Sequence, residues 1–244
     1  EKDGMAVDFD GWTTDATYQY IYSHDNVRFI RNCCYDNYTK NANCTVRYCL
    51  SVNDNKGENS MAQLLSSGSV DYAEDESAVC MDNFKFYNNT LINCSEISCA
   101  ALSNSIIANN IFVGGSLLDS GLYMHKSGDR VLTKFDGVFT NNCFWNTGAV
   151  LIGKHSFKCT PGFAGPDETD KNSFALSKDS KLIGKGIQVE DDMGEHDFFG
   201  NKLTDHRSFP CPAKAIQDKK SGCPDLETAT CVRHWRAAKR VRTK

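Results

Sequence analysis

The sequence predicts an all-β fold in which short parallel strands stack as the successive coils of a solenoid. Three observations support this prediction: a strand-like segment recurs five times, pairs of asparagines recur with it, and helical periodicity is nearly absent. Strands this short cannot bury an apolar face alone, so neighbouring repeats must stack on one another.

Five segments fit one template, an aromatic residue or asparagine followed by apolar and polar positions. They are 20–23, 48–51, 89–92, 110–113 and 142–145, and their first positions are spaced 28, 41, 21 and 32 residues apart. Alternating strand-like residues occur at 27–30, 84–86, 105–107 and 137–139. A short helical turn is expected only at 61–66 and in the C-terminal tail. The uneven spacing indicates connecting loops of different length.

Asparagine is concentrated in the repeat region, where 18 of the 20 asparagines fall between Asn26 and Asn146. Stacked asparagines in parallel sheets exchange amide hydrogen bonds from one layer to the next. The pairs 88–89, 109–110 and 141–142 occur at the turns where such a ladder would form. We therefore expect these residues to have a structural role in ladders and turns.

The chain changes character after Cys159, where the asparagine pairs stop and four of the five prolines appear between Pro161 and Pro212. We predict β-helix coils over 1–159. The start of the chain looks cut, so we expect that N-terminal coils are missing. Residues 160–231 are predicted to form a closing coil and an irregular, disulfide-pinned, Cys-rich cap. Residues 232–244 form a basic tail.

Composition and charge exclude several classes of protein. The 40% hydrophobic content in 244 residues supports a single large core rather than a disordered chain. No apolar run is long enough to cross a bilayer. The tail holds six of the 27 basic residues, so the remainder carries 21 basic against 31 acidic residues, a charge of −10. That acidic body argues against nucleic acid as a partner.

The cysteines and glycosylation sequons predict secretion. Disulfides are the simplest explanation for an even number of cysteines without a C-x-x-C pair. Four N-x-S/T sequons, which require the secretory pathway, occur at Asn37, Asn43, Asn88 and Asn93. The twelve cysteines are Cys33, Cys34, Cys44, Cys49, Cys80, Cys94, Cys99, Cys143, Cys159, Cys211, Cys223 and Cys231. Cys44 with Cys49, and Cys94 with Cys99, are close enough in sequence to form local pairs or a ladder between coils.

Several stretches resemble a known family. The segments 8–12, 18–26 and 45–54 look like consecutive coils of secreted right-handed parallel β-helix proteins of the pectate-lyase-like type, and 181–186 with 197–201 is similar to their closing motif. The resemblance covers residues 5–203 and implies a right-handed parallel β-helix, a single-stranded solenoid. The family includes lyases, polysaccharide hydrolases and binding proteins, so the resemblance leaves the activity open. Here 208–212 replaces the family's usual strand after the closing motif.

A first candidate site lies near the start of the chain. Asp8 and Asp10 alternate on a strand and so face the same side, while His24 ends the next predicted strand. Two carboxylates beside an imidazole suit acid/base chemistry or calcium binding. Trp12, Tyr20 and Tyr22 are candidate platforms for sugar rings. The alternative is that the carboxylates solvate an exposed strand and His24 lies in a turn.

Two further charged segments are candidates. Lys126 and Arg130 lie on a predicted loop between coils, and a lyase could use either as a base or to neutralise a substrate carboxylate. A solvated loop is the alternative. Residues 190–197 gather five carboxylates, but their spacing does not match an EF-hand calcium loop, and an acidic turn is the simpler interpretation.

These features predict a secreted glycoprotein that acts on or binds polysaccharide, as a lyase or glycosidase, with calcium as the one candidate cofactor. Motifs of metalloproteases, serine hydrolases and nucleotide-binding proteins are absent from the sequence. The alternative is a non-catalytic extracellular protein, such as a filament component or adhesin, whose partners are copies of itself or other matrix proteins. The sequence does not decide whether the chain is an enzyme.

Overall fold

The computed structural model describes residues 4–33, 41–54, 63–67, 79–93, 96–97, 101–114, 125–127, 130–132, 135–147, 153–165, 167 and 169–203. These residues form an all-β structure with parallel sheets, as the sequence predicts. One 3-10 helix, Lys171–Phe174, is the only helix among them. No helix in this described part is long and apolar enough to cross a membrane.

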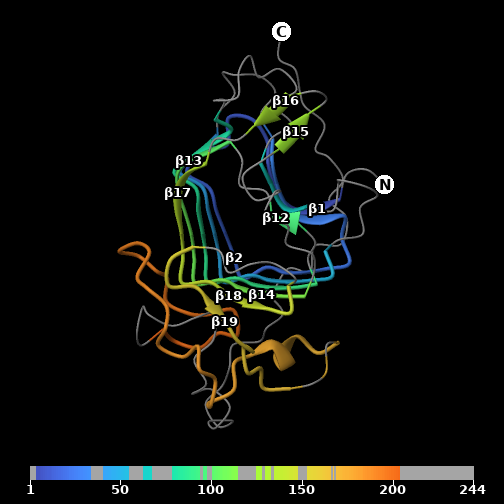
Figure 1. Ribbon diagram of the computed structural model, residues 1–244, viewed down its shortest axis with the longest axis vertical. Coiled ribbons are helices and arrows are strands. Elements are labelled where there is room, and N and C mark those ends of the chain that lie inside the picture. The colour runs from blue at the N-terminus through green and yellow to red at the C-terminus, as the bar shows by residue number, and fades with distance from the viewer. Residues whose placement is uncertain are drawn as a thin grey trace.

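Three parallel sheets surround the core (Figure 1). Sheet A contains β1 (Met5–Phe9), β4 (Arg28–Asn32), β8 (Gln63–Ser67) and β12 (Glu96–Ile97). Sheet B contains β2 (Thr17–Gln19), β6 (Thr45–Arg47), β10 (Lys85–Tyr87), β13 (Leu102–Ala108), β17 (Phe135–Thr140), β9 (Met81–Asp82) and β5 (Asn41–Ala42). Sheet C contains β3 (Tyr22–His24), β7 (Leu50–Val52), β11 (Thr90–Ile92), β14 (Ile111–Val113), β18 (Cys143–Trp145) and β19 (Phe157–Lys158).

The chain visits sheets A, B and C in turn and then returns to sheet A one layer further along. β1, β2 and β3 form the first layer, and β4, β6 and β7 pair with them in the second. The predicted helical turn at 61–66 is wrong, because Gln63–Ser67 is strand β8, which pairs with β4. β8 also pairs with β12 and so continues sheet A.

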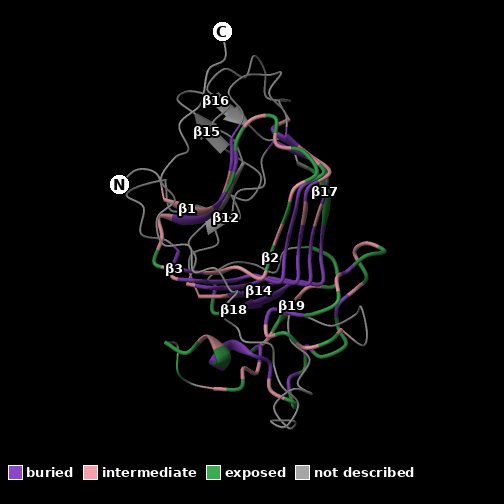
Figure 2. Ribbon diagram, turned by 180° about the vertical axis from the view of Figure 1, so that it is seen from behind, coloured by how far each residue is buried: buried purple, intermediate pink, exposed green. Residues whose placement is uncertain are grey.

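Alternation along each strand places one row of side chains inside the stack. In sheet B the inward row runs through five layers, in the order Tyr18, Val46, Phe86, Ile107 and Phe139. Aromatic rings of successive layers pack on one another, with the ring centres of Phe112 and Phe144 5.2 Å apart and the planes at 15°. Figure 2 shows the middle layers buried where sheets B and C meet, while β2 in the first layer is partly exposed.

Three columns of residues in the left-handed region mark the turns between strands, with φ between 48° and 66°. The first column is Asp15, Asn43, Asn83 and Asn104; the second is Tyr20, Tyr48, Asn88, Asn109, Asn141 and His155; the third is Asp25, Asn53, Asn93, Gly114 and Asn146. This conformation costs most residues about 1–2 kcal/mol, and asparagine tolerates it better than most. The asparagine content of the repeats therefore follows from the turns.

The predicted asparagine ladder is confirmed for the second member of each pair. Asn89 Nδ2 donates to Asn110 Oδ1 (3.1 Å), and Asn110 Nδ2 donates to Asn142 Oδ1 (3.0 Å). All three side chains are buried between sheets B and C. Each Nδ2 also donates to a backbone carbonyl of the preceding layer, so the ladder satisfies polar groups that have no access to water.

The register of the five predicted segments needs one correction. Leu50 pairs with Thr90, so Tyr48 aligns with Asn88 rather than Asn89, and the first two segments shift by one residue relative to the others. The spacing from Tyr48 to its true counterpart is therefore 40 residues, the separation from Asn43 to Asn83 in the first column. The sequence did not indicate this shift, because Tyr20 and Tyr48 occupy left-handed turns and tyrosine, unlike asparagine, is not typical of such turns.

Residues 160–203 form an irregular cap against the outer face of sheet C. Phe174, Met193 and Phe198 pack there against Tyr48, Leu50 and Tyr87. Phe163 lies edge-on to Phe174, with ring centres 5.6 Å apart. In Figure 1 the cap lies beside β18 and β19. The predicted cap cysteines Cys211, Cys223 and Cys231 and the basic tail lie outside the described residues.

Candidate functional site

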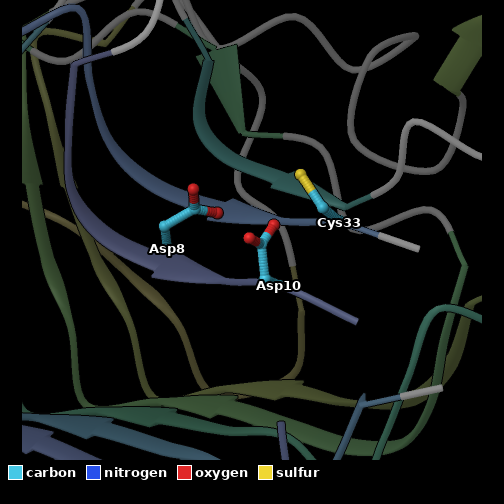
Figure 3. A group of neighbouring side chains, drawn as sticks. All are labelled: Asp8, Asp10 and Cys33. Carbon is cyan, nitrogen blue, oxygen red and sulfur yellow. The ribbon is translucent and has the colours of Figure 1, made fainter. Parts of the chain in front are cut away.

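Asp8, Asp10 and Cys33 form a cluster on sheet A. β1 buries Val7 and Phe9 in the core, so Asp8 and Asp10 face the outside, as strand alternation predicts. Cys33 follows β4, and its backbone N–H donates to Phe9 O at 2.8 Å, which holds it beside Asp10 in the next layer. A carboxylate oxygen of each aspartate and Cys33 Sγ all lie within 4.8 Å of one another (Figure 3).

The members of this cluster differ in exposure. Both carboxylates are exposed, whereas Cys33 is a free thiol with only 4% of its surface accessible. Burial raises the pKa of the Cys33 thiol to about 12; Arg31 opposes the shift, while Asp8 and Asp10 add to it. The thiol is therefore protonated at neutral pH unless a cation joins the cluster.

Trp12 lies two residues beyond Asp10, in the turn that follows β1. Its φ of 72° is in the left-handed region, and Thr13 N–H donates to Asp10 O at 3.2 Å to close the turn. Trp12 is the most exposed large hydrophobic residue of the described chain, at 67%. An exposed indole beside two carboxylates is the combination that sugar-binding surfaces use.

The structure does not bring His24 into the cluster with Asp8 and Asp10. His24 lies on β3 in sheet C, whereas Asp8 lies on β1 of sheet A and Asp10 directly follows that strand. Its Nδ1 lies 3.0 Å from Asp25 Oδ2, and its ring lies 5.1 Å from that of Tyr22. The predicted grouping of Asp8, Asp10 and His24 is therefore not assembled, because consecutive strands of one layer enter different sheets.

Tyr20 and Tyr22 contact the cap and its surroundings. Tyr22 packs against the apolar cluster beneath the cap. Tyr20 stacks on Tyr48, with ring centres 6.0 Å apart, and its hydroxyl donates to His196 O at 3.0 Å. Tyr20 and Tyr22 are only partly exposed, so of the three predicted aromatic platforms Trp12 alone is exposed.

Lys126 and Arg130 lie on a two-stranded antiparallel hairpin, β15 (His125–Ser127) and β16 (Arg130–Leu132). The backbone pairs Lys126 with Val131 and Ser127 with Arg130. The segment predicted as a protruding loop between coils therefore contains an antiparallel strand pair. Their role as a base or neutralising group stays a prediction.

A second charged cluster, which sequence reasoning missed, joins sheet B to Glu190. Lys85 Nζ lies 2.7 Å from Glu190 Oε2, and Arg47 Nη1 lies 3.4 Å from Oε1. The Tyr87 hydroxyl donates to the same carboxylate and accepts from Arg47 Nη1 at 2.9 Å. Burial and the hydrogen bond to Glu190 raise the pKa of Tyr87. Glu190 begins the segment predicted as an acidic turn.

Glu190 belongs to residues 185–196, here called the strap, which crosses the layers. Asn141 Nδ2 donates to Lys185 O at 3.0 Å. Further along the strap, Asn109 Nδ2 donates to Ile187 O at 2.8 Å, and Ile187 N–H donates to Asn109 Oδ1 at 2.9 Å.

The strap then continues toward the first layers of the stack. Arg47 Nη1 donates to Asp192 O at 2.7 Å, and Tyr20 contacts His196. The strap thus takes at least one anchor from each of five layers, in the reverse of their chain order. It covers this part of the outer face of sheet B.

A buried carboxylate supports the turn between sheets C and A. Asp54 is fully buried and accepts from Ser23 Oγ (2.5 Å), Ser51 Oγ (2.7 Å) and Asn26 N–H (2.9 Å). Burial raises its pKa, and the hydrogen bonds oppose that shift. With three donors fixed by neighbouring layers, the group suits a structural role.

The sequons have different environments. Asn43 is exposed, although its Nδ2 donates to Asp15 Oδ1 at 3.0 Å. Asn93 is half-buried and donates to Asn53 Oδ1 at 3.1 Å. Asn88 is only 1% exposed, which makes it a less accessible position for a glycan than Asn43, and its glycosylation stays a prediction. Asn37 lies outside the described residues.

Five of the twelve expected disulfide cysteines are free thiols, namely Cys33, Cys44, Cys49, Cys143 and Cys159, whereas Cys80 is disulfide-bonded. The predicted local pair of Cys44 and Cys49 is wrong. Both side chains belong to the apolar core, where their thiols donate to Ala42 O (3.3 Å) and Arg47 O (3.2 Å). The other six, Cys34, Cys94, Cys99, Cys211, Cys223 and Cys231, lie outside the described residues.

A crevice between sheet C and the cap, lined by Leu50, Phe174 and Phe198 among others, has no room for a water molecule.

Comparisons with known proteins add no relative. The chain matches no protein-family model, and a search of curated proteins finds no significant match. We therefore base the functional proposal on residue chemistry and geometry.

Proposed function

We propose that this protein is a secreted right-handed parallel β-helix glycoprotein that binds polysaccharide on the outer face of sheet A. The observation that carries the proposal is the exposed sequence of Asp8, Asp10 and Trp12 along β1 and its turn. A tryptophan face stacks on the apolar side of a sugar ring, while carboxylates accept hydrogen bonds from its hydroxyls.

The stacked layers suit a long polymer. Strands of successive layers repeat at about 4.8 Å, so side chains of equivalent positions form rows that can follow a chain of sugars. Arg31, the register partner of Asp8, supplies a cationic group to the same row. This mixture of charges favours a polar glycan over an apolar ligand.

Among catalytic activities, the geometry favours hydrolysis over elimination. Retaining glycosidases hold two carboxyl groups about 5–5.5 Å apart, and inverting enzymes hold them about 6.5–9.5 Å apart. One oxygen of Asp8 lies within 4.8 Å of one oxygen of Asp10, so the two carboxyl groups are close enough to act as a pair. A lyase would need a base close to them, and His24 lies in another sheet.

A second candidate function is structural. β1, β2 and β3 lie at the ends of their sheet orders, so each pairs with one described neighbour only. A strand edge of this kind can pair with another chain. In this alternative the stack is a subunit of an extracellular filament or adhesin, held by its asparagine ladder.

One experiment separates these functions. Purified protein is incubated, with and without calcium, with neutral and uronate polysaccharides, and reducing ends, unsaturated uronate absorbance and retention on immobilised glycan are recorded. Retention without new ends indicates binding, new reducing ends indicate hydrolysis, and absorbance indicates a lyase. No retention across the panel, together with filaments in electron micrographs, would favour the structural function.

A further inference from the structure

We propose that Asp8, Asp10 and Cys33 form a three-ligand site for a zinc-class divalent cation that links the first two layers of sheet A. The inference goes beyond polysaccharide binding and does not depend on it. Two carboxylate oxygens and a thiol sulfur within 4.8 Å of one another provide a borderline-soft ligand set.

Cys33 is the observation that distinguishes this cluster from an ordinary acidic surface. Its side chain is 4% exposed, it is a free thiol, and Figure 3 shows its sulfur on the side of the two carboxylates. A buried thiol normally packs among apolar groups, as Cys44 and Cys49 do in the core. Cys33 instead lies beside the carboxylates of Asp8 and Asp10, with Arg31 as a nearby positive group.

The required rearrangement is small. Zinc binds sulfur at about 2.3 Å and carboxylate oxygen at about 2.0–2.2 Å, which places tetrahedral ligands about 3.3–3.6 Å apart. Ligand atoms that lie within 4.8 Å must therefore close by up to about 1.5 Å. The exposed aspartate side chains can make that movement by changing rotamer while Cys33 stays fixed by its backbone bond to Phe9.

The metal and proton balance is explicit. The cation replaces the thiol proton, so Cys33 changes from S–H to a metal-bound thiolate and one proton passes to the buffer. Three ligands leave a fourth position for water, which is the arrangement of open zinc sites. Arg31 lies nearby in register with Asp8 and favours the thiolate electrostatically, so it also limits the net negative charge of the site.

A calcium site is the competing interpretation of the same carboxylates. Calcium takes six to eight oxygen ligands and does not select sulfur. The two interpretations therefore differ in whether the thiol contributes. Cys33→Ser separates them, because it replaces the sulfur and leaves both carboxylates in place.

The test uses the full chain, purified with reductant and stripped of metal by chelation. Cobalt(II) is titrated first, because a thiolate ligand gives a near-ultraviolet charge-transfer band, and zinc is then used to displace it. We expect one equivalent of metal, the charge-transfer band, and release of one proton in calorimetry in buffers of different ionisation enthalpy. Calcium should not compete at equal concentration.

Variants assign the ligands. Cys33→Ser should abolish the band, and Asp10→Asn should weaken zinc binding by about 100-fold or more, since loss of a group that merely orients a ligand already costs about 10–100-fold. Cys159→Ser is the matched control, a free thiol remote in sequence, and should keep the band. Circular dichroism of each variant checks that it has folded.

Three results would overturn the proposal. They are a band that survives Cys33→Ser, tighter binding of calcium than of zinc, or a peptide map that finds Cys33 in a disulfide. Trp12→Ala separates this proposal from the functional one, since it should lose glycan retention and keep the metal. Conversely, Cys33→Ser should lose metal binding and keep glycan retention.

Discussion

Asn110 donates from Nδ2 to Asn142 Oδ1 at 3.0 Å, although 32 residues separate them in the sequence. The backbone N–H of Asn110 donates to the same oxygen at 2.9 Å, and its Nδ2 also donates to Phe86 O. One side chain thus connects layers through buried hydrogen bonds. Stacking, rather than hairpin pairing, is what this arrangement stabilises.

Asn110→Ala should lower the free energy of unfolding by about 1–3 kcal/mol, because it leaves buried donors and acceptors without partners. The measurement is the midpoint of chemical denaturation with the slope compared. Asn172→Ala, at an exposed asparagine in the 3-10 helix, is the control and should change stability by less than about 0.5 kcal/mol. Equal midpoints for the two variants would contradict the ladder's role.

Glu190→Ala should release the strap. The change leaves the half-buried Lys85 and the buried Arg47 and Tyr87 without their shared carboxylate, which costs about 1–3 kcal/mol for hydrogen bonds to charged groups. Hydrogen exchange should then accelerate at the Ile187 amide, which Asn109 protects in the intact strap.

Lys178→Ala, at an exposed lysine of the cap, is the matched control for the strap and should leave exchange unchanged. Unaltered protection of Ile187 in Glu190→Ala would mean that the asparagine contacts hold the strap without the charged cluster. The strap would then not depend on the carboxylate.

Asp54 predicts a pH dependence of stability. Its pKa is raised above the ordinary value of 3.8 by burial, so the folded state binds its proton more tightly than the unfolded state. The stabilisation is fully present below pH 3.8 and is lost as pH rises through the folded-state pKa.

The measurement for Asp54 is the difference in unfolding free energy between the wild type and Asp54→Asn across that range. The difference removes contributions from other titrating groups. The unfolding free energy of the wild type should fall relative to that of Asp54→Asn as pH rises through the folded-state pKa. A difference that is flat with pH, or that moves the opposite way, would show that Asp54 does not bind its proton more tightly in the folded state.

Cys143 and Cys159 should form a disulfide on mild oxidation. Their sulfurs lie 4.0 Å apart, and Cys159 is half-exposed. Closure of a loop of about 15 residues stabilises a fold by about 3 kcal/mol in the chain-entropy model. Burial raises the pKa of Cys143, so we expect slow formation. Peptide mapping of the oxidised protein should recover the linked peptide, and recovery of both thiols unlinked would contradict the prediction.

Much of the fold could be predicted from local sequence. The pairs at 88–89, 109–110 and 141–142 each combine two roles. The first asparagine adopts a left-handed turn, and the second belongs to the buried ladder. Strand alternation likewise predicted that Asp8 and Asp10 share a face. Where tyrosine replaced asparagine at Tyr20 and Tyr48, the same reasoning placed the register one residue out.

The remainder depends on contacts between distant residues. Cys33 meets Asp10 only because β1 and β4 pair in one register, and no spacing rule predicts that register. Glu190 lies 105 residues from Lys85, so the acidic segment could not be assigned to a strap from its composition. The expected disulfides followed from cysteine count alone, which does not reveal whether a side chain points into the core.

The most direct test of the account is glycan binding by Trp12→Ala, with Trp145→Ala as the control. Trp145, on sheet C, is the other exposed tryptophan of the described chain, at 43%. Calorimetric titration with the polysaccharide best retained by the wild type should show binding weakened by about tenfold or more in Trp12→Ala, since burial of a large apolar side chain contributes about 1.5–3 kcal/mol. Trp145→Ala should bind as the wild type does. Equal affinity of Trp12→Ala and the wild type would contradict a binding face on sheet A.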